Sequence, residues 1–164
     1  MSAYLTLLTP MTDQDCLLSA LVDLGFDASM VEVHATPVQL VGYQGDQRIQ
    51  TANIVIRRQN VGASSNDVGF LATATGYQAL VSGYDHPRFG SEWIAQLSRC
   101  YEVHANAKKE RAAAEERRRL EEERQKLVEA QRQAVRDRAK KMGYSVEEKR
   151  EGDTIRLVLV KRVY

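Results

Sequence analysis

Short apolar runs separated by polar turns fill the first 104 residues, and this pattern predicts a sheet-containing domain. Residues 31–41 and 52–58 alternate apolar and polar side chains, as half-buried strands do, and the Gly-rich segment 42–46 between them predicts a turn. The other strands expected from the same pattern cover residues 3–8, 69–75, 77–82, 144–148 and 154–163. Because short turns join most of these strands, we expect a mostly antiparallel sheet.

Apolar residues at helical spacing predict two helices on one face of that sheet. The first begins at Thr12 as N-cap, with Asp13 and Asp15 in the first turn, and it ends at Gly25. The second begins at Ser91 and carries a core-facing stripe made of Trp93, Ile94, Leu97 and Tyr101. The predicted order is therefore β-α-β-β-β-β-α-β-β, an α+β fold.

The second helix is expected to continue far beyond the sheet. Residues 91–142 contain neither Gly nor Pro, and residues 107–141 consist almost entirely of strong helix formers. Opposite charges recur four residues apart in the pairs Glu115–Arg119, Arg117–Glu121, Arg118–Glu122 and Glu122–Lys126. A continuous helix over this stretch would be about 78 Å long at 1.5 Å per residue.

This charged segment has one apolar seam. Its members repeat every seven residues and are Ala113, Leu120, Leu127 and Ala134. The positions four residues further on are polar, whereas a stable parallel coiled coil needs both positions apolar. The pattern leaves three interpretations open, namely a solitary charged helix, a weak coiled coil or antiparallel self-pairing, and nucleic-acid contact. The last is disfavoured because glutamates interleave the arginines and reduce the field that attracts phosphate.

The last two predicted strands, residues 144–148 and 154–163, would form a hairpin. After so long a helix this hairpin cannot return directly to the first sheet. The charged segment would have to fold back as a helical hairpin, or the hairpin would stand apart, or it would complete the sheet of a second chain in a swapped dimer. A two-stranded hairpin alone is marginally stable, which favours the fold-back or the swap.

Composition indicates a protein of the reducing cytoplasm. Of the 164 residues 43% are hydrophobic, enough for a core, yet no apolar run approaches the roughly 20 residues of a membrane span. The first ten residues lack the features of a signal peptide, and two cysteines make no disulfide framework. Residues 105–142 hold 13 Lys/Arg against 8 Asp/Glu, so a basic segment accompanies a mildly acidic remainder.

The residue types that carry chemistry do not form a convincing site. Cys16, His34, Cys100 and His104 lack the close Cys pairs typical of structural zinc, so we expect no metal site. Residues 62–69 resemble a phosphate loop but lack its Gly-Lys-Ser/Thr ending. We therefore expect no cofactor and no catalytic residues.

The strongest polar cluster is expected where strands end and loops begin, and loops often carry binding residues. Its members are Asp46, Arg48, Arg57, Arg58, Asn66, Asp67, Tyr84, Asp85 and Arg88. A ligand pocket would use Arg57, Arg58, Asn66 and Asp67. The alternatives are a small-ligand or nucleotide pocket and an ordinary set of turn hydrogen bonds and ion pairs.

Several segments together resemble a family of cyanobacteria and algal plastids called hypothetical chloroplast reading frame thirty-five. They are residues 4–18, 31–34, 42–46, 55–59, 65–70, 143–148 and 152–157, with Tyr84, Asp85, Trp93 and Leu97. The resemblance implies no established activity, but it implies that both ends of the chain belong to one domain. The domain would comprise residues 1–104 and 143–164, with residues 105–142 inserted as a helical arm, and the protein would lie in the cytoplasm or the plastid stroma.

These observations favour a non-enzymatic interaction or assembly protein that associates through its arm, with a protein partner or a second copy. Ligand binding by the polar cluster is the first alternative, and nucleic-acid binding by the arm is the second. No membrane contact is expected.

Overall fold

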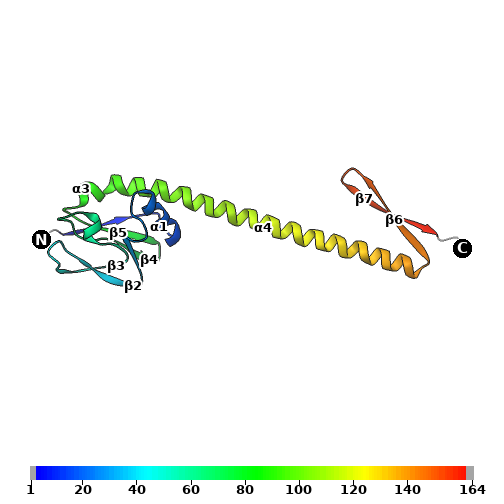
Figure 1. Cartoon of the computed structure of the whole chain (residues 1–164), viewed down its shortest axis with the longest axis horizontal. Helices are drawn as coiled ribbons and strands as arrows, with labels where there is room; N and C mark the ends of the chain where they lie inside the picture. Colours follow the sequence, from blue (N-terminus) through cyan, green and yellow to red (C-terminus); the bar gives the residue numbers. More distant parts are fainter. Residues whose placement is uncertain (1–2, 162–164) are drawn as a thin grey trace. The chain divides into compact units, whose positions relative to one another are not determined.

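The computed structural model describes residues 3–161 and confirms the α+β class (Figure 1). In chain order the elements are β1 (Tyr4–Leu8), α1 (Gln14–Asp23), β2 (Val31–Val41), β3 (Gln47–Ile56), α2 (Arg58–Val61), β4 (Val68–Thr73), β5 (Gly76–Ser82), α3 (His86–Phe89), α4 (Ser91–Lys141), β6 (Tyr144–Glu151) and β7 (Thr154–Lys161). The chain divides between Glu110 and Arg111 into two units, called here the N-terminal unit and the C-terminal unit. Helix α4 contributes to both.

The N-terminal unit is built on a five-stranded sheet in the order β1-β5-β4-β3-β2. Every neighbouring pair is antiparallel, as the short connections predict. The register aligns Phe70 of β4 with Ile54 of β3 on one side and with Ala79 of β5 on the other. These three positions therefore lie side by side across the middle of the sheet.

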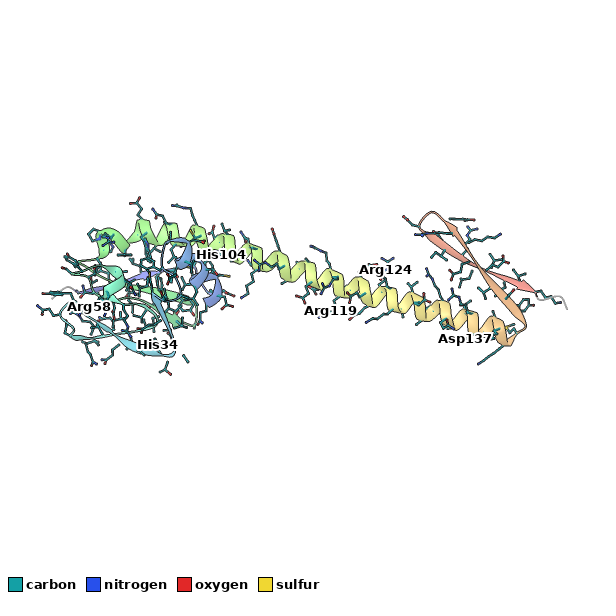
Figure 2. The ribbon with its side chains drawn as sticks, in the orientation of Figure 1. His34, Arg58, His104, Arg119, Arg124 and Asp137 are labelled. Carbon is teal, nitrogen blue, oxygen red and sulfur yellow. The ribbon has the colours of Figure 1, made fainter. Side chains whose placement is uncertain are left out.

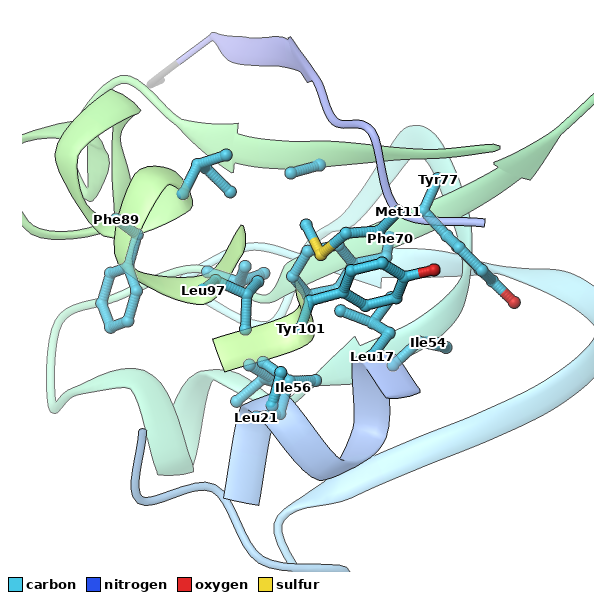
Figure 3. Close-up of a cluster of buried hydrophobic side chains, with 14 of the residues drawn as sticks. Met11, Leu17, Leu21, Ile54, Ile56, Phe70, Tyr77, Phe89, Leu97 and Tyr101 are labelled. Carbon is cyan, nitrogen blue, oxygen red and sulfur yellow. The ribbon is translucent and has the colours of Figure 1, made fainter. Parts of the chain in front are cut away.

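Helix α1 and the first turns of α4 cover one face of this sheet (Figure 1). Strand alternation directs Ile54 and Ile56 to the helices, whereas Val55 packs on the opposite face. The predicted stripe on α4 is confirmed, since Ile94, Leu97 and Tyr101 are all buried in the main core (Figure 3). The main core therefore forms between the sheet and these two helices.

Several strand bounds and local features differ from the expectation. Strand β3 covers Gln47–Ile56 instead of residues 52–58, and it ends early because Arg58 begins the single helical turn α2. Strand β6 continues to Glu151, beyond the expected end at residue 148. A second single helical turn, α3, lies around Pro87, where the periodicity predicted no helix. Helix α1 takes Asp13 as its N-cap, one residue later than predicted.

The start of α1 is held both by its own cap and by side chains of α4, which lies far away in the sequence. The Asp13 carboxylate accepts a hydrogen bond from the Cys16 amide at 3.0 Å and one from Lys108 Nζ at 2.6 Å. The Tyr101 hydroxyl accepts hydrogen bonds from the amides of Thr12 and Asp13 at 3.0 and 2.9 Å. The hydrogen bond from Lys108 has the largest effect on the pKa of Asp13, and the one from the Cys16 amide has the next largest. Together they lower this pKa to about 2.

We expect Asp13→Ala to lower the free energy of unfolding of the N-terminal unit by about 1 kcal/mol, the usual cost of losing an N-cap. Asp13→Asn is the matched control, because Asn also caps helices and only the ion pair with Lys108 is lost. The pKa of Asp13 is lower in the folded state, so its contribution is complete above pH about 4 and falls as the pH approaches 2. Urea unfolding followed by Trp93 fluorescence measures both effects, and an Asp13→Asn variant with an unchanged acid limb would contradict this assignment.

The C-terminal unit consists of the rest of α4 and a two-stranded antiparallel sheet, β6-β7. Gly143 and Gly152 take positive φ values of 81° and 60° at the two turns, a conformation that glycine adopts without strain. The hairpin contacts its own helix through an ion pair between Arg136 and Glu148, and Ala139 is buried. The predicted strand end at residue 163 lies outside the described residues.

The fold-back of the arm as a helical hairpin, one of the two favoured expectations, is wrong, because α4 runs without a break from Ser91 to Lys141. In the described chain, β6 and β7 pair with each other and not with the five-stranded sheet. The assignment of residues 1–104 and 143–164 to one domain is therefore not realised by strand pairing within a single chain, and it stays a prediction. Although α4 has 51 residues, neither it nor any other helix within residues 3–161 has a stretch apolar enough to cross a membrane.

Candidate functional site

The four predicted pocket residues of the polar cluster, Arg57, Arg58, Asn66 and Asp67, come together beside the end of β3. Asp67 lies at the centre, and its side chain is completely buried. Its Oδ2 atom accepts hydrogen bonds from the Val41 amide and from Arg57 Nη1, both at 2.8 Å. Its Oδ1 atom accepts a hydrogen bond from the Arg58 amide at 2.7 Å. The carboxylate thus holds the start of α2 and the end of β2 against each other.

Asn66 connects the same cluster to the end of β5. Its Oδ1 atom accepts hydrogen bonds from the Tyr43 amide and from Arg48 Nη2, both at 3.2 Å. Its Nδ2 atom donates to Ser82 Oγ at 3.0 Å and to Asp85 Oδ2 at 3.2 Å. A side-chain amide offers two donors and an acceptor oxygen with two lone pairs, so every hydrogen-bonding position of Asn66 is used inside the protein.

Asp85 is a second buried carboxylate, and it closes this network. It accepts hydrogen bonds from Ser82 Oγ at 2.6 Å and from the Asn66 amide at 3.0 Å. Burial raises the pKa of Asp85, but the hydrogen bonds from Ser82 and Asn66 outweigh it and hold the pKa below its usual value. Asp85 is therefore a charged structural acceptor and is not poised to act as a general acid near neutral pH.

Arg57 links the buried network to the surface. Its Nη2 atom lies 2.6 Å from Glu32 Oε2, while Nη1 contacts Asp67. The Arg57 hydrogen bond lowers the pKa of Glu32, and the Glu32 hydrogen bond in turn raises the pKa of Arg57. Arg58 extends outward, where its Nη1 atom donates to the Tyr43 carbonyl at 2.6 Å. Both guanidinium groups are thus held by protein acceptors.

A surface depression of about 490 Å³ lies over this part of the cluster. It is lined by Glu32, Val38, Gln39, Val41, Gln47, Arg57, Arg58, Gln59 and Asp67. Asn66 has no hydrogen-bonding capacity left for a ligand, and the buried Asp67 carboxylate already accepts three hydrogen bonds. The polar groups that remain for a ligand there are mainly the outward edges of Arg57, Arg58 and Glu32, with the glutamines of the rim. The ligand-binding role of Arg57, Arg58, Asn66 and Asp67 stays a prediction.

Several partners in this network were not named from the sequence. Glu32 and Ser82 are among them, as is Tyr4, whose hydroxyl donates to the Asp67 carbonyl at 2.8 Å. Each of these residues lies in a strand, where it fits the usual alternation of side chains. The sequence therefore carries no signal that links it to Asp67.

The cysteines and histidines are dispersed. His34 and His104 each lie beside a carboxylate, at 3.0 and 2.7 Å. Cys16 and Cys100 are free thiols, and burial raises the pKa of Cys16, which disfavours the reactive thiolate. Within residues 3–161 no three His, Cys, Asp or Glu side chains converge on a point where a metal could bind.

The apolar seam of the arm lies on α4 and faces solvent. All four members, Ala113, Leu120, Leu127 and Ala134, are exposed. The two large side chains provide most of the exposed apolar surface of the seam. Leu120 and Leu127 expose 53% and 61% of their surface. Residues seven apart lie within about 20° on a helix, so the two leucines share one face.

Most charges along the arm remain open to partners. Of the four pairs predicted at i,i+4 spacing, only Arg118–Glu122 forms, at 3.7 Å. Glu121 instead lies 4.0 Å from Arg124, three residues away. The side chains of Arg119 and Arg124 project outward from α4 (Figure 2). The arm therefore presents apolar and charged groups together on an exposed surface.

No family model, curated protein or solved structure matches this chain. The resemblance of its two ends to the chloroplast reading-frame family accordingly stays a prediction. The two candidate functional surfaces of the chain are the polar cluster and the arm.

Proposed function

We propose that this chain is a non-enzymatic interaction protein that binds a second copy of itself through the exposed part of α4. The observation that carries the proposal is the pair Leu120 and Leu127, two large apolar side chains on one helix face with most of their surface in water. Helices normally turn such a stripe toward a partner surface. A second copy presents the same stripe and so provides a matching surface.

The polar cluster supports the non-enzymatic part of the proposal. Asn66 and Asp67 use their polar atoms to fix loops and strand ends, and Asp85 is held as a charged acceptor. Catalytic acids and bases usually have a pKa shifted toward the working pH, which is the opposite of the shift at Asp85. The cluster fits a structural role that keeps the N-terminal unit rigid.

The size of the apolar seam limits the expected affinity. Fully burying a leucine contributes roughly 1.5–3 kcal/mol, and these leucines are already partly covered. Four such side chains in a dimer give a total comparable with the lower estimates of the cost of association, about 4 kcal/mol and more. Additional polar contacts must therefore contribute, and we expect a dissociation constant on the order of micromolar or weaker.

Replacing both leucines in the variant Leu120→Glu with Leu127→Glu tests the role of the seam. We expect its dissociation constant to rise at least about tenfold, because the apolar contact is lost and like charges face each other. Sedimentation equilibrium of the full chain gives the constant, and circular dichroism verifies that the helix is intact.

The matched control adds the same charge on the other side of α4 by combining Ala114→Glu with Gln133→Glu, and it should associate as the wild type does. Equal association of the leucine variant and the wild type would overturn the role of the seam. Equal weakening of both variants would show that net charge, and not this face, controls association.

A further inference from the structure

The charges around Leu120 are arranged in two blocks of opposite sign. Arg117, Arg118 and Arg119 precede this leucine, and Glu121, Glu122 and Glu123 follow it. All seven residues are exposed on α4. Within residues 3–161, neither Arg117, Arg119 nor Glu123 has an ion-pair partner. These charges are thus free to meet groups outside the chain.

The same antisymmetry continues outward from Leu120. Positions at equal distance before and after it carry opposite charges or at least one neutral side chain. In order outward these mirrored positions are Arg119 and Glu121, Arg118 and Glu122, Arg117 and Glu123, Glu116 and Arg124, Glu115 and Gln125, Ala114 and Lys126, Ala113 and Leu127, Ala112 and Val128, and Arg111 and Glu129. No mirrored position from 111 to 129 brings two like charges together.

This mirror pattern describes what two copies of α4 meet when they lie antiparallel. A two-fold axis at Leu120 sets each residue beside the mirrored residue of the second copy, since both helices rise equally per residue. A parallel pair in register would instead set each arginine block beside the same arginine block. Like charges at close range oppose association, so the pattern selects the antiparallel orientation.

The residues that share a face with Leu120 are complementary as well. Side chains three, four and seven residues away from a helical position lie on the same face. Around Leu120 these are Ala113, Glu116, Arg117, Glu123, Arg124 and Leu127. Across the two-fold axis Leu120 meets Leu120, and Leu127 meets the small Ala113. Arg117 meets Glu123, and Arg124 meets Glu116.

We infer that a second copy of this chain docks antiparallel on α4 with its two-fold axis at Leu120. This inference rests on the proposed self-association and adds its orientation and register. The leucines supply the apolar centre, and the charge blocks on either side decide between the two orientations.

Single cysteines on the full chain locate the axis. In a Cys100→Ser background, Leu120→Cys should form a disulfide-linked dimer with itself under mild oxidation. Leu127→Cys alone should not, since two copies of this position lie about 21 Å apart along antiparallel helices, and a disulfide needs Cα atoms within about 7 Å. Mixing the Leu127→Cys and Ala113→Cys proteins should produce a linked heterodimer.

Each other outcome has a definite meaning. If Leu127→Cys links to itself as readily as Leu120→Cys, the helices are parallel and the inference is wrong. If the protein sediments as a dimer and no arm position links, self-association stands but this face is not the interface. A protein that stays monomeric overturns the proposed function and this inference together.

Charge reversal tests the blocks independently. Changing Arg117, Arg118 and Arg119 all to Glu should weaken dimerisation at low salt at least about tenfold, and so should changing Glu121, Glu122 and Glu123 all to Arg. Mixing these two proteins should restore association as a heterodimer, and a variant with both blocks exchanged should dimerise as the wild type does. If the exchanged variant fails to associate while its helicity is intact, or if neither single-block variant is weakened, the charge blocks do not determine the pairing.

Discussion

Asp67→Ala should lower the free energy of unfolding of the N-terminal unit by about 3–5 kcal/mol, the range for removing one partner of a buried ion pair. The carboxylate is completely buried and accepts hydrogen bonds from the Val41 and Arg58 amides and from Arg57. Without it, the half-buried Val41 and Arg58 amides and part of the Arg57 guanidinium lose their acceptor. Because a domain of this size has only about 5–15 kcal/mol of stability, the variant should be close to unfolding.

Denaturant unfolding followed by Trp93 fluorescence measures this change, since Trp93 is the only tryptophan and lies in the N-terminal unit. Asp23→Ala is the matched control, because that carboxylate is exposed and, within the described part of the chain, its ion pair is with His104. Its effect should stay within about 1 kcal/mol, as for other surface ion pairs. A loss at Asp67 no larger than the loss at Asp23 would show that the cluster is not structural, and would revive ligand binding as its role.

Phe70→Ala should cost about 3–5 kcal/mol, the range for emptying a large buried site. Phe70 is completely buried in the middle strand β4 (Figure 3). It packs near the Trp93 ring, with ring centroids 6.3 Å apart. It therefore connects the sheet to the first turns of α4, and the cavity would lie where the two layers meet.

Ile49→Ala is the control for this substitution, since Ile49 exposes 93% of its surface and its removal should change stability by less than about 0.5 kcal/mol. The same unfolding experiment applies. Equal midpoints for the Phe70 and Ile49 variants would contradict the placement of the core between the sheet and the two helices.

Most of the fold could be predicted because its signals are local. Alternation at Ile54 and Ile56 and the stripe from Trp93 to Tyr101 depend only on strand and helix periodicity. The single turns α2 and α3 could not be predicted in the same way. Arg58 begins α2 where its amide is held by Asp67, nine residues later in the chain, and such a tertiary contact leaves no periodic trace.

The polar cluster was predicted as a set of residues but not as a network. Arg57, Arg58, Asn66 and Asp67 do come together, because strand ends and loops gather at one edge of the sheet. Their burial and saturation depend on partners such as Ser82, which is 16 residues from Asn66 and has no distinctive sequence context. Residue type therefore indicated polarity, whereas only the tertiary structure indicates that the polar groups are satisfied.

The arm is the opposite case, because its sequence contains a charge pattern that interactions within a single chain do not account for. Helix formers predict helix throughout the arm but leave one long helix and a helical hairpin open, and the structure has one helix that ends at Lys141. The charge blocks on either side of Leu120 do not stabilise this helix much, since only Arg118–Glu122 of the expected pairs is present. Their antisymmetry is accounted for by a second copy, which is why self-association is central to this account.

The mass of the full chain in solution tests that central claim most directly. Sedimentation equilibrium from micromolar to millimolar concentration should show the mass rising from 18.5 kDa toward twice that value, and high salt should shift the rise to higher concentration. A mass of 18.5 kDa that does not change over the whole range, at low and at high salt, would contradict the account.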